Sequence, residues 1–254
     1  YLLEYYMSKK TSINVHLKFN TGMNRYGFKA EDVKTIGLKM KKNNFLCVKS
    51  ICSHLSSSED PHKKDFTRKQ IRLFKKICDD FENLLGKSIN KHILNSNGLL
   101  NYPEAQLDMV RIGIALFGSV SDKNLTPISS LSSVISENRN INIGESVGYE
   151  SIFTANKKMN ISIVPVGYAD GLNRRLGNHL GEVIISNSSC PIIGNISMDS
   201  FIVDTSHIDC EIGDSVEIFG QKNSVIKLSE KIETIPYEIY ATINRRIKRV
   251  YLDN

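Results

Sequence analysis

The stretch Ile163–Leu176, IVPVGYADGLNRRL, changes within a few residues from a strand-like pattern to a turn. Its first residues are apolar and mostly β-branched, which is typical of a buried strand. Gly167 and Gly171 then enclose Tyr168 and Asp170, and glycine-rich turns place polar side chains at strand ends, where sites are usually built. Taken alone, an ordinary exposed loop after a core strand explains this stretch, so its role depends on the rest of the chain.

Composition places the chain among ordinary globular proteins. Its 254 residues are 41% hydrophobic and 24% charged, which is enough to bury one large core or two modest cores. No apolar run approaches the roughly 18 residues of a membrane helix, and the N-terminus lacks the basic, apolar and small-residue succession of a secretory signal. We therefore expect a cytoplasmic protein that has no membrane partner.

The cysteines and the net charge bear on other classes of function. The five cysteines are odd in number and show no CxxC spacing, which predicts reduced core thiols and no metal site. The net charge of +6 comes from scattered basic residues, without the interleaved aromatic side chains on which nucleic-acid bases stack. Solvated faces or an anionic ligand explain this charge as well, so we expect no nucleic-acid partner.

Strand and helix patterns alternate in the first half of the chain. Strand patterns cover residues 14–19, 45–51, 91–94 and 109–114, and helical spacing covers residues 31–41 and 65–85. This alternation predicts a parallel sheet with polar residues at the carboxyl ends of its strands, where barrel and doubly wound enzymes keep their sites. The residues that stand at such ends are Arg25, His54, Ser96 and Gly113.

The number of strand units is too small for a closed barrel. Only four units precede Gly118, although an eight-unit barrel takes about 250 residues. Half a barrel cannot close, and its edge strands would present unpaired backbone groups. The chain also begins with Tyr1 instead of Met, inside a helix-like pattern. We therefore expect either that a preceding segment supplies partner strands or that the fold is not a barrel.

After Gly118 the pattern changes to that of a second, β-rich domain. The polar residues 119–127 predict a linker, and residues 225–232 are the only ones beyond it with helical spacing. Short apolar runs separated by Gly, Asn and Asp predict strands at residues 128–135, 161–166, 182–185, 191–193, 201–203 and 215–219.

Eight segments, taken in order, resemble one family of enzymes. They are HLKFNTGMNRYGF (16–28), SHLSSSED (53–60), HILNSNGLLNYPEAQLDMVRIGIALFG (92–118), GESVGYES (144–151), VPVGYADGLNRRL (164–176), PIIGNISMDSFIVD (191–204), GDSVEIFG (213–220) and IPYEI (235–239). In order and spacing they resemble the pyridoxal-phosphate-dependent alanine racemases over nearly the whole chain. The resemblance implies an α/β plus β fold: an incomplete (β/α)8 (TIM-type) barrel, its C-terminal half only, in residues 1–120, followed by a β-rich C-terminal domain in residues 121–254.

The same resemblance implies a function and a partner. The function is that of an isomerase, interconverting L- and D-alanine through an external aldimine of pyridoxal 5'-phosphate for the peptidoglycan of the cell wall. The partner is a second copy, in a homodimer with shared active sites. The family's Schiff-base lysine, in a motif of the kind VVKANAYGHG, has no counterpart in the sequence, so we expect a fragment that is inactive alone. A non-catalytic remnant or dimerisation module and a serine racemase relative remain as alternatives.

The resemblance assigns acid–base catalysis to Tyr149. Racemisation at Cα removes a proton from one face and returns it on the other, so two bases must flank the substrate. One would be the lysine that the sequence lacks, and Tyr149 would be the other. A free phenol titrates near 10, so a tyrosine base needs cationic or donor neighbours. The resemblance places His54 and Arg25 in that role.

The resemblance also implies a cofactor site. Arg111 would donate a hydrogen bond to the pyridine nitrogen, and an arginine inside an apolar strand needs a partner for its charge in any case. A hydroxyl and glycine-flanked backbone N–H groups would hold the phosphate, since such cradles are common at strand ends. The phosphate-binding residues would be Ser96, Gly113, Ile114 and Tyr237.

Substrate recognition is implied in the same way. Arg25 and the backbone of Met198 would bind the carboxylate, and Tyr168 would line the entrance. Arg174 would support the site from further out. Lys18 matches a lysine that is carbamylated in several family members, where it neutralises the neighbouring arginine. The sequence does not separate alanine from serine as the substrate, because that choice depends on pocket volume.

Overall fold

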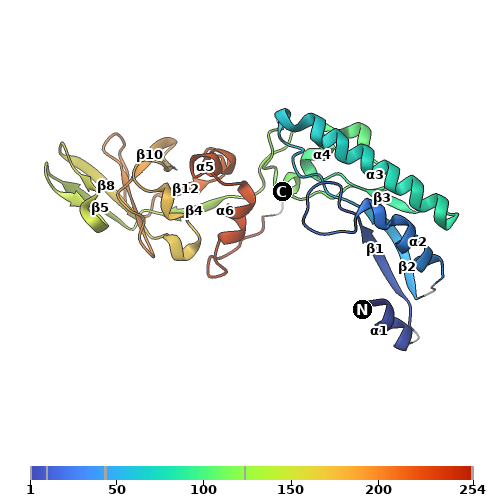
Figure 1. Ribbon diagram of the computed structural model, residues 1–254. Helices are drawn as coiled ribbons and strands as arrows, with labels where there is room; N and C mark the ends of the chain where they lie inside the picture. The colour runs from blue at the N-terminus through green and yellow to red at the C-terminus, as the bar shows by residue number, and fades with distance from the viewer. Residues whose placement is uncertain (1, 10, 43–44, 123, 253–254) are drawn as a thin grey trace. The chain divides into compact units, whose positions relative to one another are not determined.

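The chain forms two compact units in the computed structural model, which describes residues 2–9, 11–42, 45–122 and 124–252 (Figure 1). The first unit ends at Ala115 and the second begins at Leu116. Each has its own hydrophobic core, and the two cores have no residue in common. None of the described helices is both long enough and apolar enough to cross a bilayer.

The first unit contains a parallel sheet of three strands in the order β1-β2-β3. The strands are β1 (Ile13–Lys18), β2 (Leu46–Cys52) and β3 (Asn90–His92). The register pairs Lys18 with Cys52, and Cys52 with His92. Because all three strands end level, the residues that follow them emerge at one edge of the sheet, as the alternating pattern predicts.

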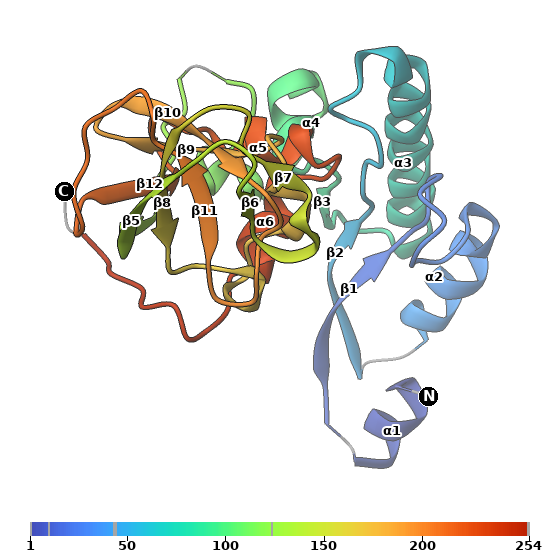
Figure 2. The same ribbon diagram turned by 90° about the vertical axis from the view of Figure 1, so that its left-hand side faces the viewer.

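The described residues of this unit form four helices, and two of them pack over the sheet. They are α1 (Leu2–Lys9), α2 (Val33–Lys41), α3 (Lys64–Leu85) and α4 (Ser96–Asn101). Helix α3 lies beside α2 over the strands (Figure 2) and ends at Gly86, which has a φ of 69° and donates its N–H to the Glu82 carbonyl. Glycine adopts this left-handed conformation without steric cost, so the helix stops there. The helix predicted at residues 65–85 is confirmed to within one residue at each end.

The prediction of a fourth strand at residues 109–114 is wrong, because the segment does not form a regular strand. Met109 and Arg111 donate backbone hydrogen bonds to the carbonyls of Lys91 and Leu94, so the segment runs beside the end of β3. Its ladder goes no further because the Gly113 N–H is taken by the Ser96 side chain. A side-chain acceptor has replaced a strand partner, which periodicity alone does not reveal.

The second unit is built on an antiparallel sheet of seven strands in the order β4-β12-β9-β10-β11-β8-β5. The strands are β4 (Leu131–Val134), β5 (Glu137–Ile141), β8 (Met159–Val164), β9 (Glu182–Ile185), β10 (Ser188–Ile193), β11 (Phe201–Asp204) and β12 (Ser215–Phe219). A separate pair consists of β6 (Ser146–Val147) and β7 (Phe153–Thr154). Helices α5 (Val225–Lys231) and α6 (Pro236–Thr242) complete the unit, and α6 packs partly buried side chains against the core of the sheet.

Four described strands and helices of this unit escape the sequence prediction: the two-residue strands β6 and β7, strand β5 and helix α6. Strand β5 has the sequence ENRNI and lies at the edge of the sheet, mostly exposed, so it shows no apolar alternation. Helix α6 has Pro236 in its first turn, where the missing N–H costs nothing, but its seven residues are too few for a clear period. The six strands predicted for this unit and the helix predicted at residues 225–232 are confirmed to within a few residues.

Two phenylalanines of α3 give a test of the first core. Phe81 is fully buried and Phe66 is 40% exposed. We expect Phe81→Ala to lower the free energy of unfolding by about 3–5 kcal/mol, because the removed ring leaves a cavity. Phe66→Ala, the matched control, should cost about 1 kcal/mol or less. Equal losses for the two variants in urea titrations would contradict this packing.

Candidate functional site

Arg111 lies at the centre of the polar residues that follow the parallel strands. One Nη atom donates to the Ser53 carbonyl at 2.6 Å and to His54 Nδ1 at 3.2 Å. The other Nη atom contacts His92 Nδ1. A partly buried guanidinium needs acceptors around it, and the ends of β2 and β3 supply them.

The hydrogen bonds of Arg111 determine where its histidine neighbours carry their protons. A guanidinium can only donate, so Nδ1 of His54 and Nδ1 of His92 accept, and each ring carries its proton on Nε2. His92 Nε2 in turn lies 3.0 Å from the Ser50 hydroxyl, which contacts Nδ1 of His16. The result is a chain of donors that begins at Arg111 and crosses the sheet to β1.

Both histidines beside Arg111 are held neutral. Burial lowers the pKa of His54 to about 4, helped by the positive charges of Arg111, Lys18 and Arg25. Burial and the charge of Arg111 likewise lower the pKa of His92 to about 4. Burial also lowers the pKa of Arg111. His54 was expected to act either as a cation or as a hydrogen-bond donor. The structure supports a neutral imidazole that donates a hydrogen bond through Nε2–H.

Three of the predicted phosphate-binding residues come together. The buried Ser96 hydroxyl accepts from the N–H of Gly113 at 2.9 Å and from the N–H of Ala115 at 3.3 Å. Ile114 lies between these two residues and begins a 3₁₀ turn. Sequence reasoning missed Ala115, although its N–H is one residue beyond those it named. Because both N–H groups donate to the Ser96 oxygen, the hydroxyl proton of Ser96 remains to be donated, and a hydroxyl beside a glycine-containing turn is typical of an anion site.

Arg25 lies on a loop that follows Lys18, the last residue of β1, and this loop is anchored at its base. Phe28 N–H donates to the Lys18 carbonyl, and Asn20 N–H donates to the Phe28 carbonyl. Gly27 has a φ of 122°, and a Cβ there would lie 2.8 Å from the backbone of Phe19. The loop therefore closes tightly and presents Arg25 exposed to solvent.

Gln70 of α3 joins this loop to the His54 loop, and sequence reasoning missed it. The side chain is 1% exposed; its oxygen accepts from the Ser56 N–H, and its nitrogen donates to the His54 carbonyl and to the Thr21 hydroxyl. A polar residue in the apolar stripe of α3 was the available signal. Buried amides are retained where all their hydrogen bonds are made.

The predicted residues of the second unit are exposed; most lie on turns, and Tyr237 lies in the first turn of α6. Tyr149, Tyr168, Met198 and Tyr237 are all at least 44% exposed. The Tyr168 N–H donates to the Ser197 carbonyl at 3.1 Å, so the turn after β8 and the turn before β11 support each other. Arg174 places Nη2 3.6 Å from the Glu150 carboxylate, one residue beyond Tyr149.

Arg246 connects these turns, and sequence reasoning missed it too. Its guanidinium binds Asp170 at 2.6 Å and Asp199 at 2.8 Å, which are neighbours of Tyr168 and Met198. Burial raises the pKa of Asp170, but the bonds from Arg246 and from the Gly167 N–H outweigh it and hold that pKa below its ordinary value. The GYADG turn is thus tied down by its own aspartate.

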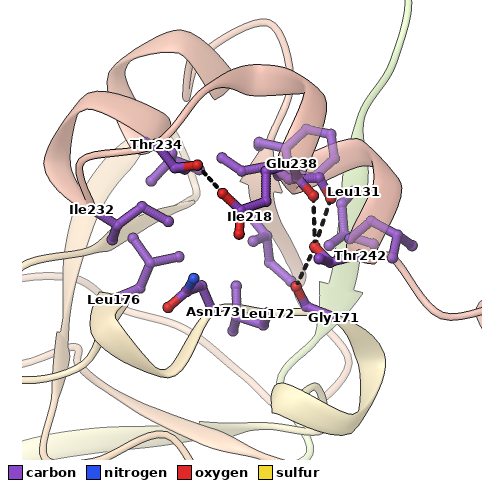
Figure 3. A pocket seen from close by; sticks show the side chains of 14 residues that line it. Leu131, Gly171, Leu172, Asn173, Leu176, Ile218, Ile232, Thr234, Glu238 and Thr242 are labelled. Atoms are coloured by element: carbon purple, nitrogen blue, oxygen red, sulfur yellow. Dashed lines mark hydrogen bonds between the residues drawn. The ribbon is translucent and has the colours of Figure 1, made fainter. Parts of the chain in front are cut away.

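Two other features of the described residues bear on the site. No group of three or more His, Cys, Asp or Glu side chains there is arranged to hold a metal ion. An apolar pocket lies between α6 and the turn that follows Gly171, where the Thr242 hydroxyl donates to the Gly171 carbonyl at 3.3 Å (Figure 3). This pocket is lined mainly by core side chains together with Glu238, and none of its lining residues is basic, so it offers no partner for the carboxylate of an amino acid.

Comparison with known proteins identifies the family. The models for "Alanine racemase, N-terminal domain" and "Alanine racemase, C-terminal domain" match residues 2–121 and 128–251. The alanine racemase of Borreliella burgdorferi is 36% identical over 257 residues, covering 96% of this chain and 67% of that protein. The chain belongs to the alanine racemase family. Alanine racemase 1 of Caldanaerobacter subterraneus is 34% identical over 93% of the chain, which spans 64% of that relative.

Solved structures of the family have the same fold. The alanine racemase of Clostridium difficile 630 superposes with a TM-score of 0.89 at 29% identity, covering 100% of this chain and 68% of that one. The alanine racemase of Bartonella henselae with covalently bound pyridoxal phosphate gives a TM-score of 0.88 at 29% identity, covering 99% of this chain and 70% of that one. The family fold therefore extends over both units, while the chain spans about two thirds of its relatives.

The neutral histidines predict a loss of stability in acid. In the unfolded chain, His54 and His92 become protonated below the ordinary His pKa of 6.5. In the folded chain they stay neutral until about pH 4. The free energy of unfolding should therefore fall as the pH drops from about 6.5 to 4, by at most about 1.4 kcal/mol per pH unit for each group. His92→Asn keeps an acceptor for Arg111 and should reduce this slope in urea titrations. The exposed His62→Asn, its control, should not.

A second prediction concerns the GYADG turn. Gly171 has a φ of 101°, and a Cβ there would lie 2.3 Å from the Thr242 carbonyl oxygen. Gly213 has a φ of 97° with open space around it. Gly213→Ala should cost about 1–2 kcal/mol for its backbone conformation alone, and Gly171→Ala distinctly more. Equal unfolding midpoints for the two variants would mean that the turn does not press on α6.

Proposed function

We propose that this chain is part of a racemase that interconverts L- and D-alanine with pyridoxal 5'-phosphate. The observation that carries the proposal is the arrangement of Arg111. All its hydrogen bonds with described residues use the two Nη atoms, so Nε–H is available to an uncharged acceptor. A pyridine nitrogen is such an acceptor, and an arginine that keeps its proton would leave that nitrogen unprotonated.

The remaining residues fit the phosphate of the same cofactor. Ser96, the backbone of Gly113 and Ile114, and the Tyr237 hydroxyl would hold it. When bound, the cofactor serves as an electron sink that makes the Cα proton of the amino acid removable. The covalently bound cofactor of the Bartonella henselae relative supports this assignment.

Tyr149 is proposed to hold and move the Cα proton on one face of the substrate. A phenolate is favoured by nearby donors and positive charge, which His54 through Nε2–H and Arg25 through its guanidinium would supply. Because His54 is neutral, the positive charge would come from Arg25. The proton on the other face would belong to the lysine that attaches the cofactor, which we propose lies outside these 254 residues.

The other assignments complete the proposal. Arg25 and the Met198 backbone would bind the carboxylate, Tyr168 would line the entrance, Arg174 would support the Tyr149 turn and Lys18 would be carbamylated. Residues 1–120 would form the second half of a barrel and residues 121–254 would complete the site of a homodimer partner. The product would supply D-alanine for peptidoglycan in the cytoplasm, whose reducing conditions suit the five free cysteines.

Pyridoxamine 5'-phosphate tests the cofactor site without a lysine, because it has no aldehyde for surface amines to capture. The purified chain should bind it more tightly than pyridoxamine, which lacks the phosphate. Ser96→Ala should weaken binding about tenfold, since it removes one hydrogen bond to a charged group. The exposed Ser121→Ala is the control.

Equal affinities for pyridoxamine and its phosphate, or for both serine variants, would refute the site. A parallel assay supplies pyridoxal phosphate with L-alanine or L-serine. We expect this chain alone to form neither D-amino acid. Turnover by the chain alone would refute the proposal that the second base lies outside it, and turnover of serine in preference to alanine would favour the serine racemase alternative.

A further inference from the structure

The turn that follows Tyr149 has an unfavourable backbone. Glu150 has a φ of 64° and Ser151 a φ of 49°, and Gly148, on the other side of Tyr149, has a φ of 73°. Residues with a side chain pay a free-energy cost in this region, and here two of them pay it in succession. Such a turn persists only when its surroundings hold it in place.

Asn195 is the side chain that holds this turn. Its amide nitrogen donates to the Glu150 carboxylate at 2.7 Å and lies 3.4 Å from the Tyr149 carbonyl. Its amide oxygen accepts from the side chain of Asn178 at 2.9 Å. Asn195 is only 8% exposed, so both ends of its amide are committed. Arg174 approaches the same Glu150 oxygen from solvent.

The backbone holds Asn195 against the strand that leads to Tyr149. Gly194 has a φ of 64°, and a Cβ there would lie 2.9 Å from the Val147 carbonyl oxygen. The Gly194 carbonyl also accepts from the Asn178 N–H at 3.0 Å. A residue larger than glycine would push the two segments apart, so the close approach sets the position of the Asn195 amide.

The phenol of Tyr149 has no comparable support of its own. Its side chain is 69% exposed, and no described residue forms a hydrogen bond with its hydroxyl. The direction of the ring is therefore set through its backbone and the turn behind it. Glycine would adopt the backbone of residue 150 at lower cost, so the Glu150 side chain must contribute something that glycine lacks.

We propose that Asn195 and Glu150 are positioning residues that hold the Tyr149 ring in one direction. The inference rests on the proposed function, in which this phenol moves the Cα proton. A proton carrier has to keep its oxygen within hydrogen-bond reach of the reacting atom, so an exposed ring gains from a rigid turn. The Asn195–Glu150 pair supplies that rigidity at the residue next to the ring.

The experiment reports on the ring directly. The chain carries ten tyrosines, and 3-fluorotyrosine labelling with Tyr149→Phe as the assignment variant identifies the ¹⁹F resonance of residue 149. Glu150→Gly relieves the backbone cost but removes the carboxylate. We expect the Tyr149 resonance to move toward that of the unfolded chain and to narrow, while the melting temperature changes by no more than about 4 °C. A purely structural role for Glu150 would not produce this combination.

A matched control exists in the same unit. Glu233 also has a positive φ of 58° and pairs with an arginine, Arg175, at 3.0 Å. Glu233→Gly therefore makes the same chemical change away from Tyr149. It should leave the Tyr149 resonance unchanged.

Exchange of the two partners tests the pairing itself. Asn195→Asp places two carboxylates together and should mobilise the ring as Glu150→Gly does. Adding Glu150→Gln should restore the original resonance, because the new amide at 150 donates to the new carboxylate at 195. An unchanged resonance in Glu150→Gly, or no recovery in the double variant, would overturn the inference. The readout needs neither cofactor nor turnover, so its failure is distinguishable from failure of the proposed function.

Discussion

The first unit depends on satisfying one partly buried positive charge. An arginine cannot give up its proton, so Arg111 has to find acceptors wherever the fold places it. It finds them in the Ser53 carbonyl and in the two neutral histidines at the ends of β2 and β3. The three-strand register, which makes these ends level, is the geometric condition for that arrangement. The cluster of polar groups at this edge of the sheet is thus the set of acceptors that Arg111 requires.

In the second unit the charged groups that organise the local structure are carboxylates on turns. Asp170 is buried and needs donors, and it obtains them from Arg246 and from the Gly167 backbone. Glu150 is exposed but holds a turn that its backbone disfavours. In both cases a charged side chain stabilises the turn next to a tyrosine. The exposed side chains of Tyr149 and Tyr168 are thus attached to turns whose backbones are fixed by hydrogen bonds and ion pairs.

The sequence predicted elements whose causes are local. Strands β9 and β12 were predicted at their observed limits, because buried alternation and flanking turn residues mark both ends. It failed where the cause is distant. Gln70 contacts loops 14 to 49 residues away, and Arg246 contacts Asp170 across 76 residues, so no spacing rule reveals either contact. The union of Ser96 with Gly113 was reached through family resemblance, since an isolated NSNG motif predicts only a turn.

The strand order of the second unit has a consequence for its synthesis. Its first strand, β4, lies at the edge of the sheet, and among the described residues it pairs only with β12, the last strand to be made. At ordinary rates of translation, the ribosome needs on the order of ten seconds to produce the residues between them. During that time the backbone groups of β4 have no partner within the sheet, and folding of this unit waits for a contact of long sequence separation. The nascent chain is therefore most exposed to mispairing before β12 emerges.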